Sequence, residues 1–285
     1  MNYRNSIGTA AAVAALVMTS MAAQAFDDAK YPDLSGQWVA VRLGVRGQPA
    51  FDPTKPWGLG QQAPLTPEYQ KVLEASVAEQ AKGNQGNWLS GVSCLPTGMP
   101  AMMTLYRPME IVVLPEVTYV LIDHTHQSHR RIFTDGRDWP KDFLPSFRGY
   151  SLGKWIDTDG DGKYDVLEIE TRGLLSPRVF DASGLPLHKD GQSVIKERIF
   201  VDKSDKNIIY DQITVVDNAL TRPWTITKKA QRIALERPVW RTAVCAENNT
   251  RIKIEDENYF LSSTGKLMPT RKDQPPPDLR YFNRN

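Results

Sequence analysis

The chain has 285 residues, and its 35 basic and 33 acidic side chains give a formal net charge of +2 at pH 7. A charge so close to balance implies neither the basic surface of a nucleic-acid-binding protein nor the polybasic patch of a protein that binds anionic membranes. Without the N-terminal segment described next, roughly 260 residues remain, which suits one β-rich domain or two small ones.

The first 25 residues have the pattern of a secretory signal peptide. Arg4 supplies the positive start, residues 10–18 form a short apolar run, and Ala23-Gln24-Ala25 is a cleavage site of the small-x-small type. The apolar run is too short for a membrane-spanning helix. We therefore expect a mature protein, residues 26–285, in the periplasm or outside the cell, with no membrane span. The alternative is an N-terminal anchor that stays uncut.

The two cysteines, Cys94 and Cys245, both lie in the part expected to be exported. In an oxidising compartment such a pair is expected to form one disulfide, and the alternative is two buried thiols. The bond would close a loop of about 150 residues. It would join the middle of the chain to its C-terminal part, which favours a single domain.

One helix is predicted, and it precedes most of the strands. A first strand is expected at 37–41, and a loop rich in Gly, Pro and Gln follows at 46–64. Thr66 and Pro67 are residue types that favour the N-cap and the first position of a helix. Gly83 is the natural stop of that helix.

Short runs rich in Val, Ile, Thr and Tyr follow, and turn residues separate them. They predict strands at 110–114, 118–123, 130–134, 166–170, 193–201, 208–216 and 224–232. Hairpin spacing without intervening helices favours an all-β fold, an antiparallel barrel or sandwich with one short N-terminal helix. We expect a single domain over 26–285, with an extended or loosely docked tail from about residue 270.

An Asp-rich turn interrupts a predicted hairpin over residues 149–171. Carboxylates at alternate positions, followed by a glycine, have the spacing of a calcium-binding loop. The expected ligands are Asp157, Asp159, Asp161, the carbonyl of Lys163, Asp165 and Glu168. Asp and Gly also form turns without a metal, so a plain turn is the alternative.

The flanks of this turn decide which kind of calcium loop it is. An EF-hand needs helices on both sides, whereas residues 166–170 alternate apolar and acidic side chains as a strand does. The turn resembles the Asp-x-Asp-Gly-Asp-Gly-x-x-Asp loop found between strands of calcium-stapled β-proteins. In that setting Asp165 is a better closing ligand than Glu168, and the ion stiffens the structure.

Several short motifs occur in a specific order between about Asp33 and Asn248. They are Asp33-Leu34-Ser35-Gly36-x-Trp38, Cys94-x-Pro96-x-Gly98-Met99-Pro100, Glu110-Ile111-Val112, Arg130-Arg131-Ile132-Phe133-Thr134-Asp135-Gly136-Arg137, Gly149-x-Ser151-x-Gly153-x-Trp155, Glu197-Arg198 and Pro223-Trp224-Thr225. In the order of these motifs the chain resembles a large, mostly uncharacterised group of exported bacterial proteins. The resemblance implies a lipocalin-like (calycin-like) β-barrel and no particular activity. This chain departs from the pattern at its enlarged Asp-rich turn and at Trp139, where relatives often have His before Pro.

A barrel of this kind would enclose a ligand with apolar and aromatic side chains. Trp155 and Trp224 are candidate lining residues, and the Met-rich segment 99–103 is either pocket lining or core filler. Arg130 and Arg137 could bind a carboxylate or phosphate of the ligand. In the alternative they brace the fold, paired with Asp135, Asp138 or Glu110.

Histidines supply two candidate sites for chemistry. His124 and His126 alternate on a strand, so they face one side, as two ligands of Zn²⁺ or Fe²⁺ do. The alternative is a polar strand end. His188 and Glu197 would suit acid/base catalysis in a lyase, isomerase or hydrolase if they meet.

Two functions remain open from the sequence. The first is an exported protein that binds a small hydrophobic or aromatic molecule and carries a structural Ca²⁺. The second is an exported enzyme on the same scaffold, using either the His124/His126 pair or the His188/Glu197 pair. We favour binding, because none of these spacings is specific to a catalytic site. The sequence does not define the oligomeric state.

Overall fold

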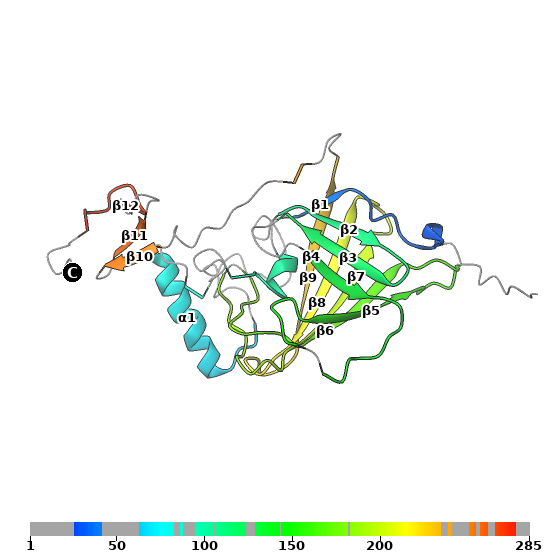
Figure 1. The fold of residues 1–285 in the computed structure, drawn as a ribbon, viewed down its shortest axis with the longest axis horizontal. Coiled ribbons are helices and arrows are strands. Elements are labelled where there is room, and N and C mark those ends of the chain that lie inside the picture. The colour runs from blue at the N-terminus through cyan, green and yellow to red at the C-terminus, as the bar shows by residue number, and fades with distance from the viewer. Residues whose placement is uncertain are drawn as a thin grey trace, which may run out of the picture.

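A computed structural model describes most of the chain as strands connected by loops (Figure 1). The described residues are 26–41, 63–82, 86–87, 95–104, 107–123, 129–142, 144–181, 183–234, 239–240, 251–254, 257–261 and 266–277. They include one α-helix and two sheets, of nine and three strands. The prediction of a mainly antiparallel β-fold with one short helix is confirmed at this level.

The nine-stranded sheet, called the main sheet below, has a closed strand order. Each strand pairs with the next along the chain, and β1 pairs with both β2 and β9. Every pairing is antiparallel except β4 with β5, which is parallel. The strands are β1 (Gln37–Ala40), β2 (Met109–Val113), β3 (Val117–Ile122), β4 (His129–Phe133), β5 (Tyr150–Ile156), β6 (Val166–Arg172), β7 (Val194–Val201), β8 (Ile208–Val216) and β9 (Trp224–Ile233).

Alternation of side chains gives the main sheet a buried face and an exposed face. On β7, Ile195, Glu197 and Ile199 are buried, whereas Lys196 and Arg198 between them are exposed. We call the buried face the inner face. Its core includes side chains from most of the strands, among them Trp38, Val120, Ile132, Leu167, Ile195, Ile213 and Ile226. The period of two in the sequence is therefore what places these groups on one side.

Helix α1 (Pro67–Ala81) lies beside the main sheet in Figure 1. It begins as the sequence predicts, because the Thr66 side chain accepts a hydrogen bond from the Tyr69 backbone N–H at 3.4 Å and Pro67 takes the first turn. Leu73 of this helix is buried in the hydrophobic core. The helix ends at Ala81, and the predicted stop, Gly83, lies outside the described residues. No helix in the described segments has both the length and the apolar character needed to cross a membrane.

A second, three-stranded antiparallel sheet lies near the C-terminus, where the sequence predicted no strand. It consists of β10 (Arg251–Ile254), β11 (Glu257–Leu261) and β12 (Leu267–Pro269). The following segment docks on it: the Tyr259 hydroxyl donates to the Pro275 carbonyl at 3.0 Å, and Gln274 Nε2 donates to the Asn258 carbonyl at 2.6 Å. These strands have three to five residues, which is too short for an alternation pattern to stand out.

Candidate ligand-binding site

Four charged side chains occupy the inner face of the main sheet. Arg130 on β4, Glu197 on β7, Asp211 on β8 and Lys228 on β9 are all less than one tenth exposed. A buried charge is costly unless it is paired and hydrogen-bonded. The partners of each of these four groups therefore show which of them are paired and stabilise the fold, and which are not.

Arg130 and Glu197 satisfy each other. Arg130 Nη1 donates to Glu197 Oε1 at 2.9 Å, and Nη2 donates to Oε2 at 2.5 Å. Two hydroxyls complete the contact, because Nε donates to Ser151 Oγ at 3.2 Å and Nη2 donates to Thr171 Oγ1 at 2.8 Å. Arg130 is thus a brace, and its partner is none of the three acidic residues expected from the sequence.

Asp211 has no such partner. It is 6% exposed, and neither of its carboxylate oxygens has a hydrogen-bond partner among the described residues. Burial raises the pKa of Asp211 well above its ordinary value, the negative charge of Glu197 raises it further, and Arg130 and Lys228 oppose this rise. An unpaired buried carboxylate is rare in a protein interior and needs an explanation.

Lys228 is the cross-strand neighbour of Asp211 and lies on the same face. Its ammonium nitrogen is 5.6 Å from the ring centre of Phe180 and makes no described hydrogen bond. Burial lowers the pKa of Lys228, while the negative charges of Asp181 and Asp211 oppose this change. An acceptor and a donor therefore lie side by side on the inner face. The carboxylate oxygens are buried without a partner, and the ammonium makes no hydrogen bond to a described residue.

Both groups border a small cavity whose other lining residues are apolar except for Arg107 and Lys229. The cavity has a volume of about 20 Å³, which is room for about one water molecule. Met102 and Met103 form one wall, and the strands supply the rest, including Ile111, Ile122, Ile199, Ile209 and Ala230. An apolar cavity with a few convergent polar groups is the usual form of a small-molecule site.

The methionine wall belongs to the short 3-10 helix η3 (Ala101–Thr104). The turn before it needs a glycine, because Gly98 has a φ of +68° and a Cβ there would lie 2.5 Å from the Phe147 carbonyl oxygen. The Met99 backbone N–H donates to the same oxygen at 2.8 Å. Met99, Met102 and Met103 all belong to the core, and Met102 and Met103 also line the cavity.

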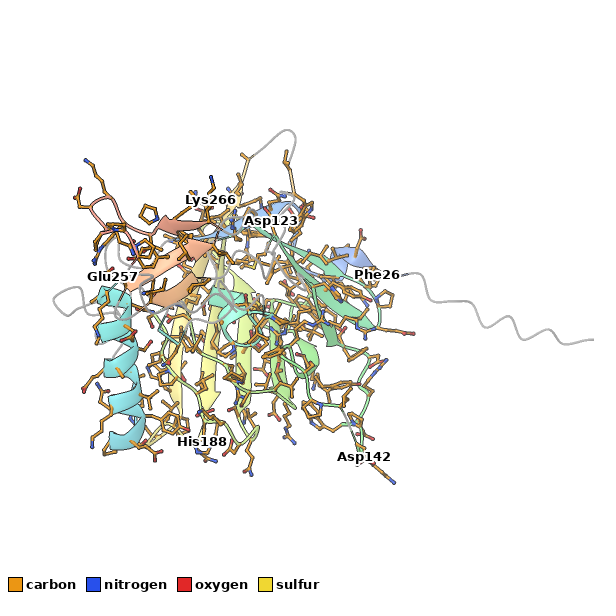
Figure 2. All side chains as sticks on the ribbon, turned by 60° about the vertical axis from the view of Figure 1, so that its left-hand side comes forward. Phe26, Asp123, Asp142, His188, Glu257 and Lys266 are labelled. Atoms are coloured by element: carbon orange, nitrogen blue, oxygen red, sulfur yellow. The ribbon has the colours of Figure 1, made fainter. Side chains whose placement is uncertain are left out.

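His188 lies in a loop cluster at one end of the main sheet, and Figure 2 shows it at the end opposite to Asp123. Its ring packs on Tyr69, with ring centres 5.3 Å apart, and Nδ1 lies 2.8 Å from Asp190 Oδ2. Its backbone N–H donates to Asp217 Oδ1 at 2.9 Å. Glu197 binds Arg130 with both oxygens. The structure therefore gives the two members of the expected acid/base pair separate partners.

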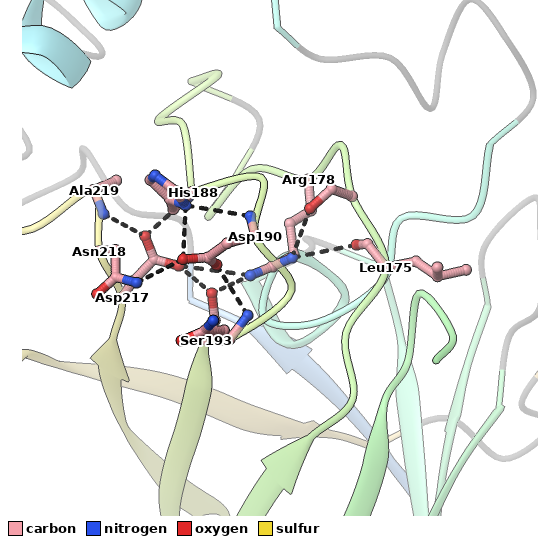
Figure 3. Close-up of polar contacts among 10 residues, drawn as sticks. Leu175, Arg178, His188, Asp190, Ser193, Asp217, Asn218 and Ala219 are labelled. Atoms are coloured by element: carbon pink, nitrogen blue, oxygen red, sulfur yellow. Dashed lines mark hydrogen bonds and ion pairs between the residues drawn. The ribbon is translucent and has the colours of Figure 1, made fainter. Parts of the chain in front are cut away.

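The cluster around Asp217 is a set of braces (Figure 3). Ser193 donates its hydroxyl to Asp217 Oδ2, and Arg178 Nη2 lies 3.5 Å from the same oxygen. The remaining Asp217 oxygen accepts from the Ala219 backbone N–H at 2.8 Å. The Ser193 hydroxyl is thus bound to a carboxylate and an arginine, so this cluster ties two loops together.

The Asp-rich turn brings three of its predicted ligands together. One carboxylate oxygen from each of Asp157, Asp159 and Asp161 lies within 4.8 Å of the others. Asp157 also accepts backbone N–H bonds from Gly160 at 2.7 Å and Gly162 at 2.9 Å. These bonds are the ones expected of a turn, and the three close carboxylates are those expected of a cation loop.

Two of the other predicted ligands, Asp165 and Glu168, have partners outside the three close carboxylates, and no contact of the Lys163 carbonyl is described. Asp165 accepts from the Thr158 backbone N–H at 2.9 Å and from the Thr158 hydroxyl. Glu168 lies on β6 and pairs with Arg198 Nε at 3.2 Å. The Lys163 backbone N–H donates to Asp161 Oδ1 at 2.8 Å.

The remaining predicted ligand-binding residues lie apart from the cavity. Arg137 is exposed, pairs with Asp135 at 2.6 Å and stacks over Phe133, 4.0 Å from its ring centre. The buried indoles have core partners: Trp155 Nε1 donates to Thr118 Oγ1 at 3.3 Å, and Trp224 packs on Phe180 with ring centres 4.8 Å apart. His124, His126, Cys94 and Cys245 lie outside the described residues.

Neither Asp211 nor Lys228 was predicted from the sequence to be a site residue. A signal was present, because Asp211 stands between Ile209 and Ile213 at the apolar positions of an alternating strand. A charge at a position where the pattern requires an apolar side chain indicates a buried charge. Comparison of the chain with protein-family models, with curated proteins and with solved structures found no match.

Proposed function

We propose that this chain is an exported binding protein whose main sheet acts as a lipocalin-like barrel around a small hydrophobic or aromatic molecule. The unpartnered carboxylate of Asp211, facing a mostly apolar cavity, carries the proposal. Leaving such a group without a hydrogen bond costs on the order of 1–3 kcal/mol. A ligand that supplies the missing contact explains why the position holds an acid.

A ligand larger than water has to displace the side chains of Met102 and Met103, because the cavity measures only about 20 Å³. Methionine suits this role, since its unbranched and flexible side chain repacks around differently shaped neighbours. The proposed binding step is therefore an exchange, in which the ligand takes the place of two thioether side chains.

The test is binding of small aromatic compounds to the purified protein by calorimetry and thermal unfolding. We expect a compound of the size of toluene or p-cresol to bind with one-to-one stoichiometry and to raise the melting temperature as its concentration rises. Ala230→Leu fills the cavity and is expected to abolish both effects. Gln231→Leu adds the same side chain at the next, exposed position of β9 and should leave them unchanged. Equal behaviour of the two variants would place any binding outside this cavity.

The alternative, a lyase, isomerase or hydrolase that uses His188 and Glu197, has no observation in its favour, because each group binds a separate partner. A Zn²⁺ or Fe²⁺ site at His124 and His126 stays a prediction. Elemental analysis of the protein purified without added metal or chelator measures it, and stoichiometric zinc or iron would favour the enzyme.

We also propose that the Asp-rich turn holds a structural Ca²⁺. The three close carboxylates of Asp157, Asp159 and Asp161 support this, because without a cation they repel one another. Calcium added to metal-free protein is expected to raise the melting temperature by several degrees, and Asp159→Asn with Asp161→Asn is expected to remove that response. Asp205→Asn, in another exposed turn, is the control. A melting temperature that is the same in calcium and in chelator would identify a plain turn.

A further inference from the structure

The Asp211 cavity also defines the polar group that its ligand carries, an inference that rests on the function proposed above. Ionised Asp211 can only accept hydrogen bonds, and the Lys228 ammonium can only donate them. The register of β8 and β9 makes them direct neighbours, and both border the cavity. Neither oxygen of Asp211 has a partner in the described part of the chain. The site therefore lacks one donor beside Asp211 and one acceptor beside Lys228.

The size of the cavity limits what can fill both needs. A volume of about 20 Å³ admits roughly one polar atom with its hydrogens. An ammonium group on the ligand would satisfy Asp211 alone, and a carboxylate would satisfy Lys228 alone. Either of them would also bring a further charge into a site where burial already disfavours charge. A hydroxyl is neutral and both donates and accepts through one oxygen.

We propose that the ligand is an apolar alcohol or phenol whose hydroxyl donates to Asp211 and accepts from Lys228. Its hydrocarbon or aromatic part replaces the side chains of Met102 and Met103. A hydroxyl also fits the site if the proton moves from Lys228 to Asp211. The neutral carboxyl of Asp211 then donates to the hydroxyl oxygen, and the neutral amine of Lys228 accepts from the hydroxyl. Asp181, the other acid near Lys228, accepts from the Ser183 backbone and hydroxyl with Oδ1, while its Oδ2 has no partner among the described residues. Asp181 does not line the cavity, so Asp211 is the acceptor that faces it.

The experiment compares four ligands of one shape by calorimetry: p-cresol with a hydroxyl, toluene without a polar group, benzylamine as a cation and benzoate as an anion. We expect p-cresol to bind at least about tenfold more tightly than toluene, because a site built to hydrogen-bond a hydroxyl discriminates strongly against the analogue that lacks it. We expect the two charged compounds to bind more weakly than p-cresol. In the Asp211→Val, Lys228→Met double variant, which removes both partners of the hydroxyl, the preference for p-cresol over toluene should fall to about twofold or less.

The controls separate failure of the ligand class from failure of the proposed function. Lys196→Met makes the same substitution on the exposed face of β7 and should keep the preference, and circular dichroism checks the fold of every variant. If p-cresol and toluene bind equally well and Ala230→Leu abolishes the binding of both, the hydroxyl is not recognised. The proposed binding function would still be supported by that result. Preference for benzylamine or benzoate would overturn the ligand class in the same way. If none of the four compounds binds, the cavity holds a water molecule only, and both proposals fail.

Discussion

Glu197→Ala is expected to lower the free energy of unfolding by about 3–5 kcal/mol, the usual cost of removing one partner from a buried ion pair. The side chains of Arg130 and Glu197 are 1% and 0% exposed. Removing the carboxylate leaves the guanidinium in the core with only Ser151 and Thr171 as described partners. The acid that still acts on its charge is Asp211, which makes no hydrogen bond to it. Urea unfolding followed by tryptophan fluorescence measures the loss.

Two further variants separate loss of the pair from loss of packing. Arg198→Ala removes the partner of Glu168 on the exposed face, where both side chains are 49% exposed, and should cost about 1 kcal/mol or less. The double variant Arg130→Met, Glu197→Leu removes both charges and should recover much of the stability lost in Glu197→Ala. If Glu197→Ala costs no more than Arg198→Ala, the buried pair does not stabilise the fold.

Local patterns were sufficient to predict most elements of the main sheet. Strand β8 was predicted with its observed bounds, 208–216, because a run rich in Ile, Tyr, Thr and Val between turn residues is typical of a strand. The start of α1 was equally accessible, since Thr66 and Pro67 act within one turn of the chain. Both features depend on neighbours in sequence, which a single sequence displays directly.

Partners across the sheet were not accessible in the same way. Arg130 binds a carboxylate 67 positions away, and the sequence offered nearer acids at residues 110, 135 and 138. The choice depends on which strands lie opposite each other inside the sheet, and alternation gives the face of each side chain but not its neighbours. The separation of His188 from Glu197 has the same origin, because β7 directs Glu197 inward while His188 stays in a loop cluster.

The Asp-rich turn shows a different limit. Its position between β5 and β6 was predicted from the flanking strands and is observed. Its ligand set was taken from the spacing of known loops, yet Asp165 bonds to Thr158 and Glu168 continues the alternation of β6 toward Arg198. Spacing predicts where the chain turns, while the orientation of each carboxylate depends on competing donors nearby.

Asp211→Asn is expected to stabilise the protein at neutral pH, and its effect should depend on pH. The folded-state pKa of Asp211 is raised by burial and then by Glu197, against the opposing charges of Arg130 and Lys228. Folding therefore favours the protonated form. Protonated Asp211 thus contributes to the free energy of unfolding of the wild-type protein. This contribution is complete below the unfolded-state pKa of about 3.9, and it is lost as the pH rises through the folded-state pKa. The asparagine variant has no proton to lose at this position.

The measurement is urea unfolding of both proteins between pH 4 and pH 8, where titrations that they share cancel in the difference. We expect the variant to gain on the wild type as the pH rises above about 4, by about 1.4 kcal/mol per pH unit until the folded-state pKa of Asp211 is reached. Asp190→Asn is the matched control, because the pKa of Asp190 is shifted in the opposite direction, downward. Although burial opposes it, hydrogen bonds from the Gln192 backbone and from Asn218 lower the pKa of Asp190. That variant should be less stable than the wild type by a constant amount between pH 5 and pH 8, and the difference should shrink only below about pH 4. Parallel curves for Asp211→Asn and the wild type would mean that a contact absent from the described structure satisfies this carboxylate, and the argument for a ligand at Asp211 would then fail.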